Sequence, residues 1–317
     1  MKNIRVGLIG RGMAGTVFHA PLIRAVARME LVAVAGSADA PAVIADPDVD
    51  LIVVATPNRS HFPLARAALS AGKDVVVDKP FTVTLGEADA LIALAAEKAR
   101  LLTVFHNRRW DGDFMTVREL IEAGRLGEVM LFEAHWDRFR PAIKQGWREE
   151  PGDGAGLLSD LGPHMIDQAL LLFGAPDAIY ADIEVQRPEA KVDDYFALML
   201  HYGARRVHLS ASTLAAAPRP RFAVHGTGAS FIKYGLDRQE QGLSEDDPAN
   251  YGTLTLQDGT ASRIATAPGG YGSFYEAVAE AVLGEGRPPV DPADARAGLR
   301  LIELARRSAR EGRAISV

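Results

Sequence analysis

The 317-residue chain contains no cysteine. This absence excludes disulfide bonds, thiolate metal ligands and cysteine nucleophiles. The sequence also lacks any apolar run near the ~18 residues of a membrane-spanning helix. Its opening residues Met1-Lys2-Asn3 are too short and too polar a start for a signal peptide, so we expect a cytoplasmic protein. A net charge of −6 argues against nucleic acid or an anionic membrane as the main partner.

What is present is typical of a folded protein. Hydrophobic residues make up 48% of the chain, and its length suggests two domains. In the first third, short apolar runs alternate with helical patterns. The predicted strands are Ile4–Ile9, Leu31–Ala35, Leu51–Ala55, Val75–Val77 and Leu101–Phe105, and the predicted helices are Val17–Ala27, His61–Ala71 and Gly86–Lys98. Repeated strand–helix units predict a doubly wound parallel α/β sheet of the Rossmann type over residues 1–112.

The pattern changes after about Asn107, where polar and apolar residues begin to alternate one by one. Such alternation predicts a mainly antiparallel open sheet with one solvated face. The predicted strands are Val129–Arg138, Ala178–Gln186, Tyr195–Tyr202, Arg206–Thr213 and Thr253–Gln257, and the predicted helices are Phe114–Ala123, Leu158–Phe173, Phe274–Val282 and Pro292–Arg310. We therefore expect an α+β domain over residues 113–317.

A glycine-rich turn follows the first predicted strand and opens a helical pattern. It reads Gly10-Arg11-Gly12-Met13-Ala14-Gly15, a G-x-G-x-x-G motif. The first glycine permits the tight turn, the second lets a pyrophosphate approach the backbone, and the third lets helix and strand pack closely. The start of the helix offers N–H donors to the phosphates. In this context the motif predicts a dinucleotide site.

The end of the second predicted strand bears on the choice between NAD and NADP. It has no acidic residue of the kind that binds a ribose 2′-hydroxyl. Ser37 can donate to a phosphate there, and Arg11 either adds positive charge or is simply solvated, so NADP is favoured. Asp39 would favour NAD if the turn brings it back towards the ribose. The following crossover, Ser37–Pro47, is short for a strand–helix–strand unit, so its helix is truncated or an element is missing.

Two further segments carry candidate catalytic groups. Lys79 ends a buried strand, where ligands bind in open α/β sheets, and can stabilise negative charge on a substrate oxygen, unless it is a solvated residue at a helix entry. Asp160 and His164 are four residues apart and share a helical face, although Pro163 suggests that the helix proper begins near Gly162. His164 is a candidate general base or a structural histidine, and Asp160 would orient it or bind a hydroxyl. With no clear third ligand, no metal site is predicted.

Together these segments resemble the Gfo/Idh/MocA oxidoreductase family over essentially the whole chain. The resemblance rests on the glycine turn, Ala55-Thr56-Pro57-Asn58 with His61, Asp78-Lys79-Pro80 in place of the commoner Glu-Lys-Pro, and Asp160-x-x-x-His164. Further motifs, such as Phe18-His19-Ala20-Pro21 and Tyr234-Gly235-Leu236-Asp237, are similar to a branch with NADP-dependent scyllo-inositol dehydrogenases. That branch usually has a longer chain after Ser37 and around Gln241.

The resemblance implies roles for individual residues. It implies a catalytic set of Lys79, Asp160 and His164. Besides the glycine turn and Ser37, the implied cofactor residues are Thr56, Pro57, Asn58, His61, Asp78, Lys79, Asn107 and Arg108. The implied substrate-binding residues are Lys79, Arg109, Trp147, Asp160 and His164, with Arg138, Arg140, Trp110 and Arg148 as further candidates or ordinary surface and packing residues. The second domain's sheet would form a homodimer or homotetramer.

We therefore expect an enzyme that transfers a hydride between NADP or NAD and a polyol or sugar bound between the domains. We expect this enzyme to use no metal ion. His164 would take the hydroxyl proton, and Lys79 would stabilise the alkoxide. Two alternatives remain: a dinucleotide-binding sensor on the same fold, and an enzyme that oxidises transiently to enable elimination or hydrolysis. Asp167 either orients His164 or binds a substrate hydroxyl, as Asp160 would, or is only a surface acid. The remaining histidines are expected to be structural: His106, His135, His201, His208 and His225.

Overall fold

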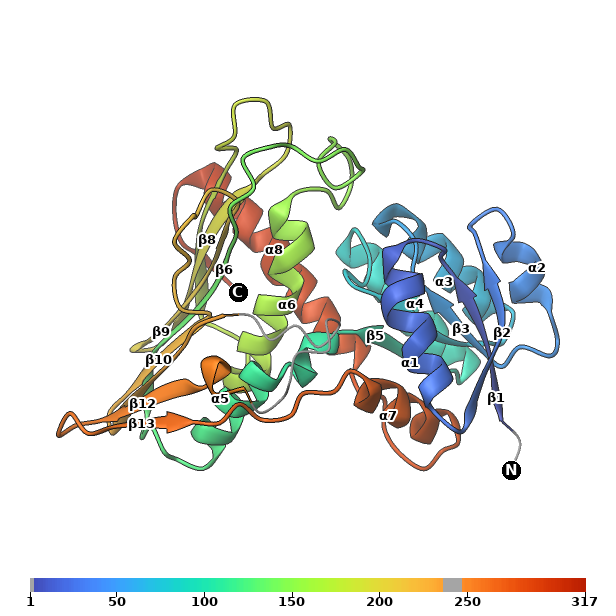
Figure 1. Ribbon diagram of the computed structural model, residues 1–317. Coiled ribbons are helices and arrows are strands. Elements are labelled where there is room, and N and C mark those ends of the chain that lie inside the picture. The colour runs from blue at the N-terminus through green and yellow to red at the C-terminus, as the bar shows by residue number, and fades with distance from the viewer. Residues whose placement is uncertain (1–2, 236–246) are drawn as a thin grey trace. The chain divides into compact units, whose positions relative to one another are not determined.

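The computed structural model describes residues 3–235 and 247–317 (Figure 1). The chain forms two compact units, which are Met1–Asn107 with Tyr271–Leu299, and Arg108–Gly270 with Arg300–Val317. These units differ from the predicted ranges 1–112 and 113–317 in two respects. The chain changes unit after residue 107, and a late segment, residues 271–299, packs with the first unit. The buried hydroxyl of Thr103 donates to the carbonyl of Val290 at 2.7 Å, a contact across 187 positions that no local pattern reveals.

The first unit is built on a five-stranded parallel sheet in the order β2-β1-β3-β4-β5, which confirms the predicted Rossmann architecture. The strands are β1 (Ile4–Ile9), β2 (Met29–Ala35), β3 (Leu51–Val54), β4 (Asp74–Asp78) and β5 (Leu102–Phe105). Every residue of β3 and β5 is buried, as expected for parallel strands with helices on both faces. The helices of this unit are α1 (Ala20–Ala25), α2 (Ala40–Ala45), α3 (His61–Ser70), α4 (Leu85–Lys98) and α7 (Gly272–Val282).

The helix after the glycine turn differs from the predicted range Val17–Ala27. A π-helix occupies Ala14–His19, and α1 continues to Ala25. In the wider π turn the Ala20 N–H donates to the carbonyl of Gly15, five residues earlier. Pro21 has no N–H with which to extend the usual ladder, and single wide turns of this kind occur often at functional sites.

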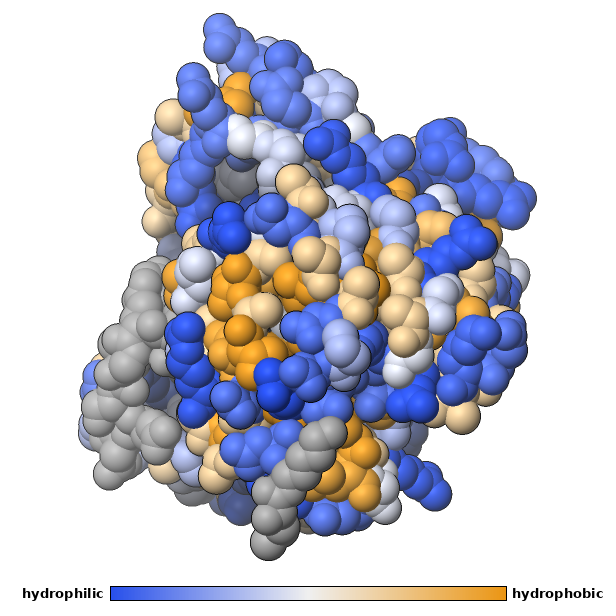
Figure 2. Space-filling model, turned by 90° about the vertical axis from the view of Figure 1, so that its right-hand side faces the viewer, coloured by the Kyte–Doolittle hydropathy of each residue, from blue (hydrophilic) through white to orange (hydrophobic). Residues whose placement is uncertain are grey.

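The short connection between β2 and β3 keeps its helix, but this helix is truncated. Its helix α2 has only six residues, and among the described residues no strand lies outside β2, which is the edge of the sheet. Most residues of β2 are therefore only half-buried. Figure 2 views the molecule from the side on which Figure 1 places β2 and α2. Hydrophobic residues gather in the middle of this face, with hydrophilic ones around them.

The second unit is built on a nine-stranded sheet in the order β13-β12-β11-β10-β6-β9-β8-β7-β14. Only β6 and β9 pair in parallel within the described sheet, and the other pairs are antiparallel, as predicted. The strands are β6 (Val129–Asp137), β7 (Ala178–Glu184), β8 (Tyr195–Tyr202), β9 (Arg205–Ser212), β10 (Phe222–Gly226), β11 (Ala229–Lys233), β12 (Gly252–Leu256), β13 (Ala261–Ile264) and β14 (Ile315–Ser316). Of these, β10, β11, β13 and β14 were not predicted.

One face of this sheet is covered by helices. They are α5 (Gly112–Glu122), α6 (Leu157–Phe173) and the C-terminal part of α8 (Pro292–Glu311) (Figure 1). Alternate residues of β8, namely Phe196, Leu198 and Leu200, enter the same apolar core as Met165 of α6 and Ile302 of α8. No helix among the described residues is both long and apolar enough to cross a membrane. The predicted shortening around Gln241 falls outside the described residues.

The start of α6 corrects the expectation that the helix proper begins near Gly162. The helix begins at Leu157 and contains Pro163. Its first N–H groups are satisfied by a distant acidic residue, because Leu157 donates to the carbonyl of Asp193 at 2.8 Å and Leu158 to its carboxylate at 2.7 Å. This long-range cap starts the helix one and a half turns before the proline, so that Asp160 lies within it.

Candidate active site

The glycine turn has the geometry that a dinucleotide requires. Gly10 has φ +143°, and a Cβ there would lie 2.1 Å from the carbonyl oxygen of Ala55. A Cβ on Gly15 would lie 2.0 Å from the carbonyl oxygen of Gly10, so the third glycine allows the helix to pack on the strand. A Cβ on Gly12 would meet nothing within 4 Å. The backbone at Gly12 is therefore open to a phosphate, and the turn fits the cofactor.

Arg11 reaches the end of β2, where the adenosine side of a dinucleotide is expected. Its Nη2 donates to the carbonyl of Val34 at 3.3 Å and lies 3.4 Å from a carboxylate oxygen of Asp39. The turn after Gly36 thus brings Asp39 back towards the end of the strand. Both side chains remain more than half exposed. The edge of the sheet near Ser37 consequently carries a positive and a negative group together, and both are available to a ribose or its phosphate.

The residues after β3 surround a buried histidine. His61 is fully buried, with Nδ1 2.8 Å from the carbonyl oxygen of Pro80 and Nε2 2.9 Å from that of Thr56. Burial lowers the pKa of this imidazole. His61 therefore ties the loop after β3 to the loop after β4. Asn58 is also buried, and the buried Thr56 Oγ1 has no hydrogen-bond partner among the described residues, which leaves this hydroxyl to a ligand.

Lys79 directly follows β4, and Asp78 is the last residue of that strand. The carboxylate of Asp78 accepts the backbone N–H of Lys79 at 2.8 Å. Burial opposes the charge on this carboxyl, but the nearby His19, the ammonium of Lys79 and His61 outweigh burial and lower the pKa of Asp78. The first unit thus presents a lysine whose backbone is held by an ionised carboxylate at the carboxyl end of a central strand.

The second unit presents Asp160 and His164 on α6. They lie one helical turn apart, and the His164 side chain is nearly buried. The ring of His164 stacks on that of Trp136 from β6, with centroids 6.1 Å apart and planes 28° apart. Arg148 Nε lies 3.4 Å from Asp160 Oδ1. A base held against an aromatic ring, beside a carboxylate paired with an arginine, suits proton transfer to or from a polar substrate.

Besides His164, three arginine side chains lie close to the Trp136 ring. The guanidinium carbons of Arg108, Arg221 and Arg138 lie 4.4, 4.9 and 5.6 Å from the ring centroid. Cations over a tryptophan face are attracted by its ring quadrupole. Arg108, implied as a cofactor residue, also pairs with Asp111 at 3.1 Å. These contacts fix the aromatic ring on which His164 rests.

Arg109, implied as a substrate residue, is engaged by Asp167. Its Nε and Nη2 donate to the two carboxylate oxygens at 2.8 and 2.7 Å, and both side chains are largely buried. Asp167 lies on α6 and is a buried partner of Arg109, so the alternative of a surface acid is wrong. A two-pronged pair of this kind orders both side chains. This pair holds the Arg109 guanidinium against α6.

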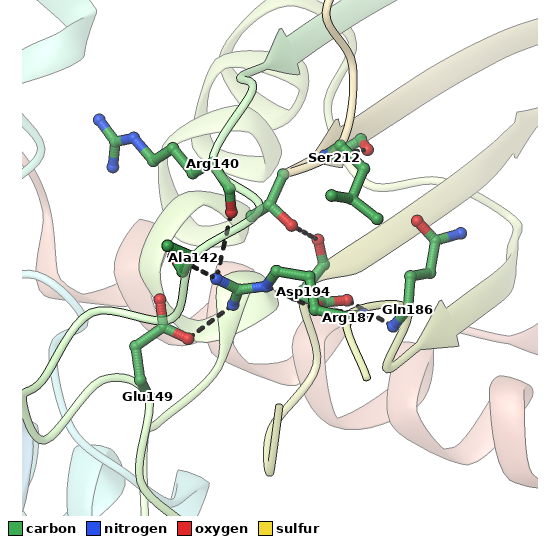
Figure 3. Close-up of polar contacts among 9 residues, drawn as sticks. Arg140, Ala142, Glu149, Gln186, Arg187, Asp194 and Ser212 are labelled. Atoms are coloured by element: carbon green, nitrogen blue, oxygen red, sulfur yellow. Dashed lines mark hydrogen bonds and ion pairs between the residues drawn. The ribbon is translucent and has the colours of Figure 1, made fainter. Parts of the chain in front are cut away.

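Trp147 and Arg148 belong to a loop between β6 and α6 that is pinned by Arg187 (Figure 3). The buried Arg187 guanidinium donates to Asp194 at 2.8 Å and to Glu149 at 2.6 Å, and contacts the carbonyls of Arg140 and Ala142 at 3.4 Å. Trp147 is partly exposed, and the Arg148 guanidinium lies 4.5 Å from its ring centroid. The loop that carries Arg148 to Asp160 is thus fixed by one buried arginine.

Sequence reasoning missed several of these supports. Trp136 and Arg187 have no local motif, because each acts on residues far away in the chain. The strand histidines pair with strand neighbours: His135 Nδ1 lies 2.8 Å from Ser210 Oγ, and His225 Nδ1 lies 2.9 Å from Ser230 Oγ. Asn107 is buried at the start of the 3₁₀ turn that follows β5.

The chain matches sequence models of two oxidoreductase-family domains. Residues 37–106 match the NAD-binding Rossmann fold of the Gfo/Idh/MocA oxidoreductases, and residues 118–317 match their C-terminal alpha/beta domain. The second match alone spans more than half of the chain.

Known proteins are similar to the chain over nearly its whole length. The uncharacterized oxidoreductase YdgJ of Escherichia coli (strain K12) is 46% identical, with 97% of each chain covered. The scyllo-inositol 2-dehydrogenase (NADP(+)) IolW of Bacillus subtilis (strain 168) is 38% identical, over 99% of this chain and 96% of IolW. The solved structure of yvaA from Bacillus subtilis superposes with a TM-score of 0.96 at 35% identity, over 100% of this chain and 99% of the other. With the matching domain models and the glycine turn, these similarities show that the chain belongs to the Gfo/Idh/MocA family of NAD(P)-dependent oxidoreductases.

Proposed function

We propose that this protein transfers a hydride between a nicotinamide cofactor, preferably NADP, and a hydroxyl group of a polyol or cyclic sugar such as an inositol. The observation that carries the proposal is the placement of Asp160 and His164 one turn apart on α6, with His164 nearly buried against Trp136. The relative IolW, named as an NADP-dependent scyllo-inositol dehydrogenase, supports the substrate class. So does a levoglucosan dehydrogenase that is 26% identical over 82% of the chain.

In the proposed mechanism His164 removes the hydroxyl proton of the substrate as the hydride leaves the same carbon. A histidine suits this role because its ordinary pKa lies near neutral pH. The ammonium of Lys79 stabilises the negative charge that develops on the oxygen. Asp160 holds a neighbouring substrate hydroxyl and is itself held by Arg148. A bound nicotinamide supplies the hydride chemistry, and the glycine turn with Thr56 and Asn58 would hold that cofactor.

The preference for NADP is proposed from Arg11 and Ser37. The guanidinium of Arg11 reaches from the glycine turn to the end of β2, where it would pair well with a ribose 2′-phosphate. The position of Asp39 beside Arg11 works in the opposite direction, because its carboxylate would repel the phosphate and accept from an unmodified ribose. We infer that Arg11 dominates, in agreement with the cofactor named for IolW.

The substrate-facing residues of the second unit are proposed to include Trp147 and Arg148. Trp147 is partly exposed, and an aromatic face of this kind packs against the C–H groups of a sugar or inositol. Arg109 contributes by holding Asp167, and thereby α6, in place.

We also propose a homodimer or homotetramer formed through the nine-stranded sheet, whose outward side chains, such as Tyr180, are exposed.

The proposal is tested by the absorbance of reduced nicotinamide with purified protein. NADP⁺ and NAD⁺ are offered separately with scyllo-inositol, myo-inositol and a set of aldoses, using Lys79→Ala and His164→Ala as controls. We expect reduction with NADP⁺ that both substitutions abolish. Cofactor binding without turnover of any substrate would favour a dinucleotide sensor. Product formation without net reduction, from protein that retains its cofactor, would favour transient oxidation coupled to elimination or hydrolysis.

A further inference from the structure

A buried polar cluster in the first unit lies behind Lys79 and has no role in the mechanism above. His19, at the end of the π-helix, is fully buried, and its Nδ1 lies 2.6 Å from the hydroxyl of Tyr275. Its Nε2 lies 3.8 Å from Oδ1 of Asp78, which is longer than a direct hydrogen bond. Tyr275 is also fully buried and comes from α7, which packs beside α1 (Figure 1).

Packing fixes the orientation of the His19 ring. The ring centroid lies 4.3 Å from that of Phe105 and 6.0 Å from that of Tyr275, which it meets edge to face. Phe274 packs edge to face against Phe105, with ring centroids 4.9 Å apart. This packing fixes the plane of the imidazole, and the hydrogen bond between Nδ1 and the Tyr275 hydroxyl selects this orientation over the one turned by 180°.

The partners of His19 decide where its proton lies. Burial and the charge of Asp78 raise the pKa of Tyr275, so this hydroxyl keeps its proton and can donate it to Nδ1. The ring proton of a neutral His19 then belongs to Nε2, and an imidazolium also carries a proton there. The other neutral arrangement would point the Nε2 lone pair at a carboxylate. Nε2 therefore directs an N–H towards Asp78 in every favourable arrangement.

Asp78 in turn holds Lys79. Its carboxylate accepts the Lys79 backbone N–H at 2.8 Å. The charged and titratable groups that face this carboxylate are His19 from the π-helix, Lys79 itself and His61 from α3, with the hydroxyl of Tyr275 beyond His19. Without the His19 N–H, fewer groups would stabilise the negative charge of the largely buried Asp78 carboxylate. A protonated Asp78 would then hold the Lys79 backbone N–H less strongly than the carboxylate does.

We propose that Tyr275 and His19 are positioning residues for Lys79. Tyr275 sets the proton on His19, His19 keeps Asp78 ionised and oriented, and Asp78 fixes the residue that carries the catalytic ammonium. Residues 271–299 pack with the first unit, and α7 within this segment supplies Tyr275, the outermost member of the chain of contacts. The role given to Lys79 rests on the proposed function, so the first test uses no substrate.

The first test follows Lys79 by ¹³C NMR after reductive methylation of the lysines. Lys79→Arg identifies the signal by its disappearance. We expect an inflection at acidic pH that reports the titration of Asp78. In His19→Leu and Tyr275→Phe this inflection should move to higher pH. Tyr202→Phe is the matched control, because it removes a hydroxyl that donates to the carbonyl of Gly174 in the second unit, and it should leave the inflection in place.

Two conservative variants separate this role from a packing role. The side-chain amide nitrogen of His19→Gln takes the place of Nε2, and that of His19→Asn takes the place of Nδ1. We expect the glutamine variant to retain the wild-type inflection and the asparagine variant to lose it. An inflection at the same pH in the wild type, His19→Asn and Tyr275→Phe would overturn the proposal. The comparison holds even if His19→Leu fails to fold.

The second test uses turnover of whichever substrate the enzyme reduces. Misplacement of a catalytic group by about 1 Å can cost up to about a hundredfold in rate. We therefore expect kcat to fall about ten- to a hundredfold in His19→Asn and Tyr275→Phe, with KM for NADPH little changed and recovery in His19→Gln. If the wild type turns over nothing, the proposed function fails while the NMR result still decides the positioning role. Full kcat in both variants would overturn that role.

Discussion

At the scale of single residues, the proposed mechanism depends on His164. Its ring lies nearly buried against Trp136, one turn from Asp160. A positioned general base contributes about 10²- to 10⁴-fold to a rate. We expect His164→Ala to lower kcat by that range and to leave NADPH affinity, measured by fluorescence titration, nearly unchanged. His225→Ala, which removes a partly exposed histidine bound to Ser230, is the matched control and should retain activity. If His164→Ala and His225→Ala had the same kcat, His164 would not be the general base.

The choice of cofactor is a second property of single residues. Arg11 and Asp39 lie 3.4 Å apart at the end of β2, where their charges act in opposite directions. A hydrogen bond to a charged group is worth about 1.5–3 kcal/mol, and both side chains are solvated, so the lower value applies. We expect Arg11→Ala to reduce the kcat/KM ratio of NADP to NAD by about tenfold, and Asp39→Asn to increase it. Unchanged ratios in both variants would place cofactor selection elsewhere.

At the scale of elements, the β6–β9 pair contains a histidine that is held neutral. Burial, followed by the charge of Arg219, lowers the pKa of His135 from 6.5 to about 4. Between these values the unfolded chain binds a proton that the folded protein does not. The free energy of unfolding therefore falls as the pH falls from 6.5 towards about 4, by at most about 1.4 kcal/mol per pH unit.

This pH dependence is measured by urea unfolding of the wild type and His135→Asn at several pH values across that window. We expect the wild type to lose stability more steeply than the variant on acidification. The contact with Ser210 is made by Nδ1, whose place the asparagine amide takes, so the variant should keep this hydrogen bond and fold. Parallel pH profiles for the two proteins would show that His135 is not the group responsible.

The loop between β6 and α6 depends on Arg187. Breaking a buried ion pair from one side typically costs about 3–5 kcal/mol, because the remaining charge stays buried. Arg187→Met leaves the buried Asp194 without that partner and releases Glu149. We expect a loss of stability of about 3–5 kcal/mol in chemical unfolding, together with a lower kcat/KM, because Arg148 would lose its place beside Asp160.

The chain offers a matched control for this loop. Lys191 pairs with Glu150 at 3.0 Å, but both side chains are mostly exposed. Exposed pairs contribute little to stability, so Lys191→Met should unfold nearly as the wild type does. Equal losses in the two variants would mean that the loop is held by something other than the buried guanidinium.

At the scale of the whole molecule, local patterns predicted most of the architecture. The glycine turn, the parallel strands of the first unit and the spacing of Asp160 and His164 are all short-range features, because each depends on neighbours along the chain. The alternation of β6 to β9 likewise predicted an antiparallel sheet, which the structure and the family match confirm.

What the sequence did not reveal depends on residues far apart. Asp193 caps the start of α6 from 35 positions away, so the sequence pattern around α6 does not show this cap. Without it, Pro163 led to a predicted helix start that was too late. The contact of His19 with Tyr275 spans 256 positions, and it accompanies the return of residues 271–299 to the first unit. Strands β10 and β11 are short and join through Thr227-Gly228, so their pattern is too brief to separate from a loop.

The measurement that tests the central claim most directly is the fate of the substrate's carbinol hydrogen. An inositol or sugar that supports turnover is prepared with deuterium on its carbinol carbons, and the reduced cofactor is analysed by mass spectrometry. We expect one deuterium in each NADPH formed, because the hydride passes directly from carbon to nicotinamide. Deuterium found in water, with none in the cofactor, would contradict direct hydride transfer and with it the function proposed for this protein.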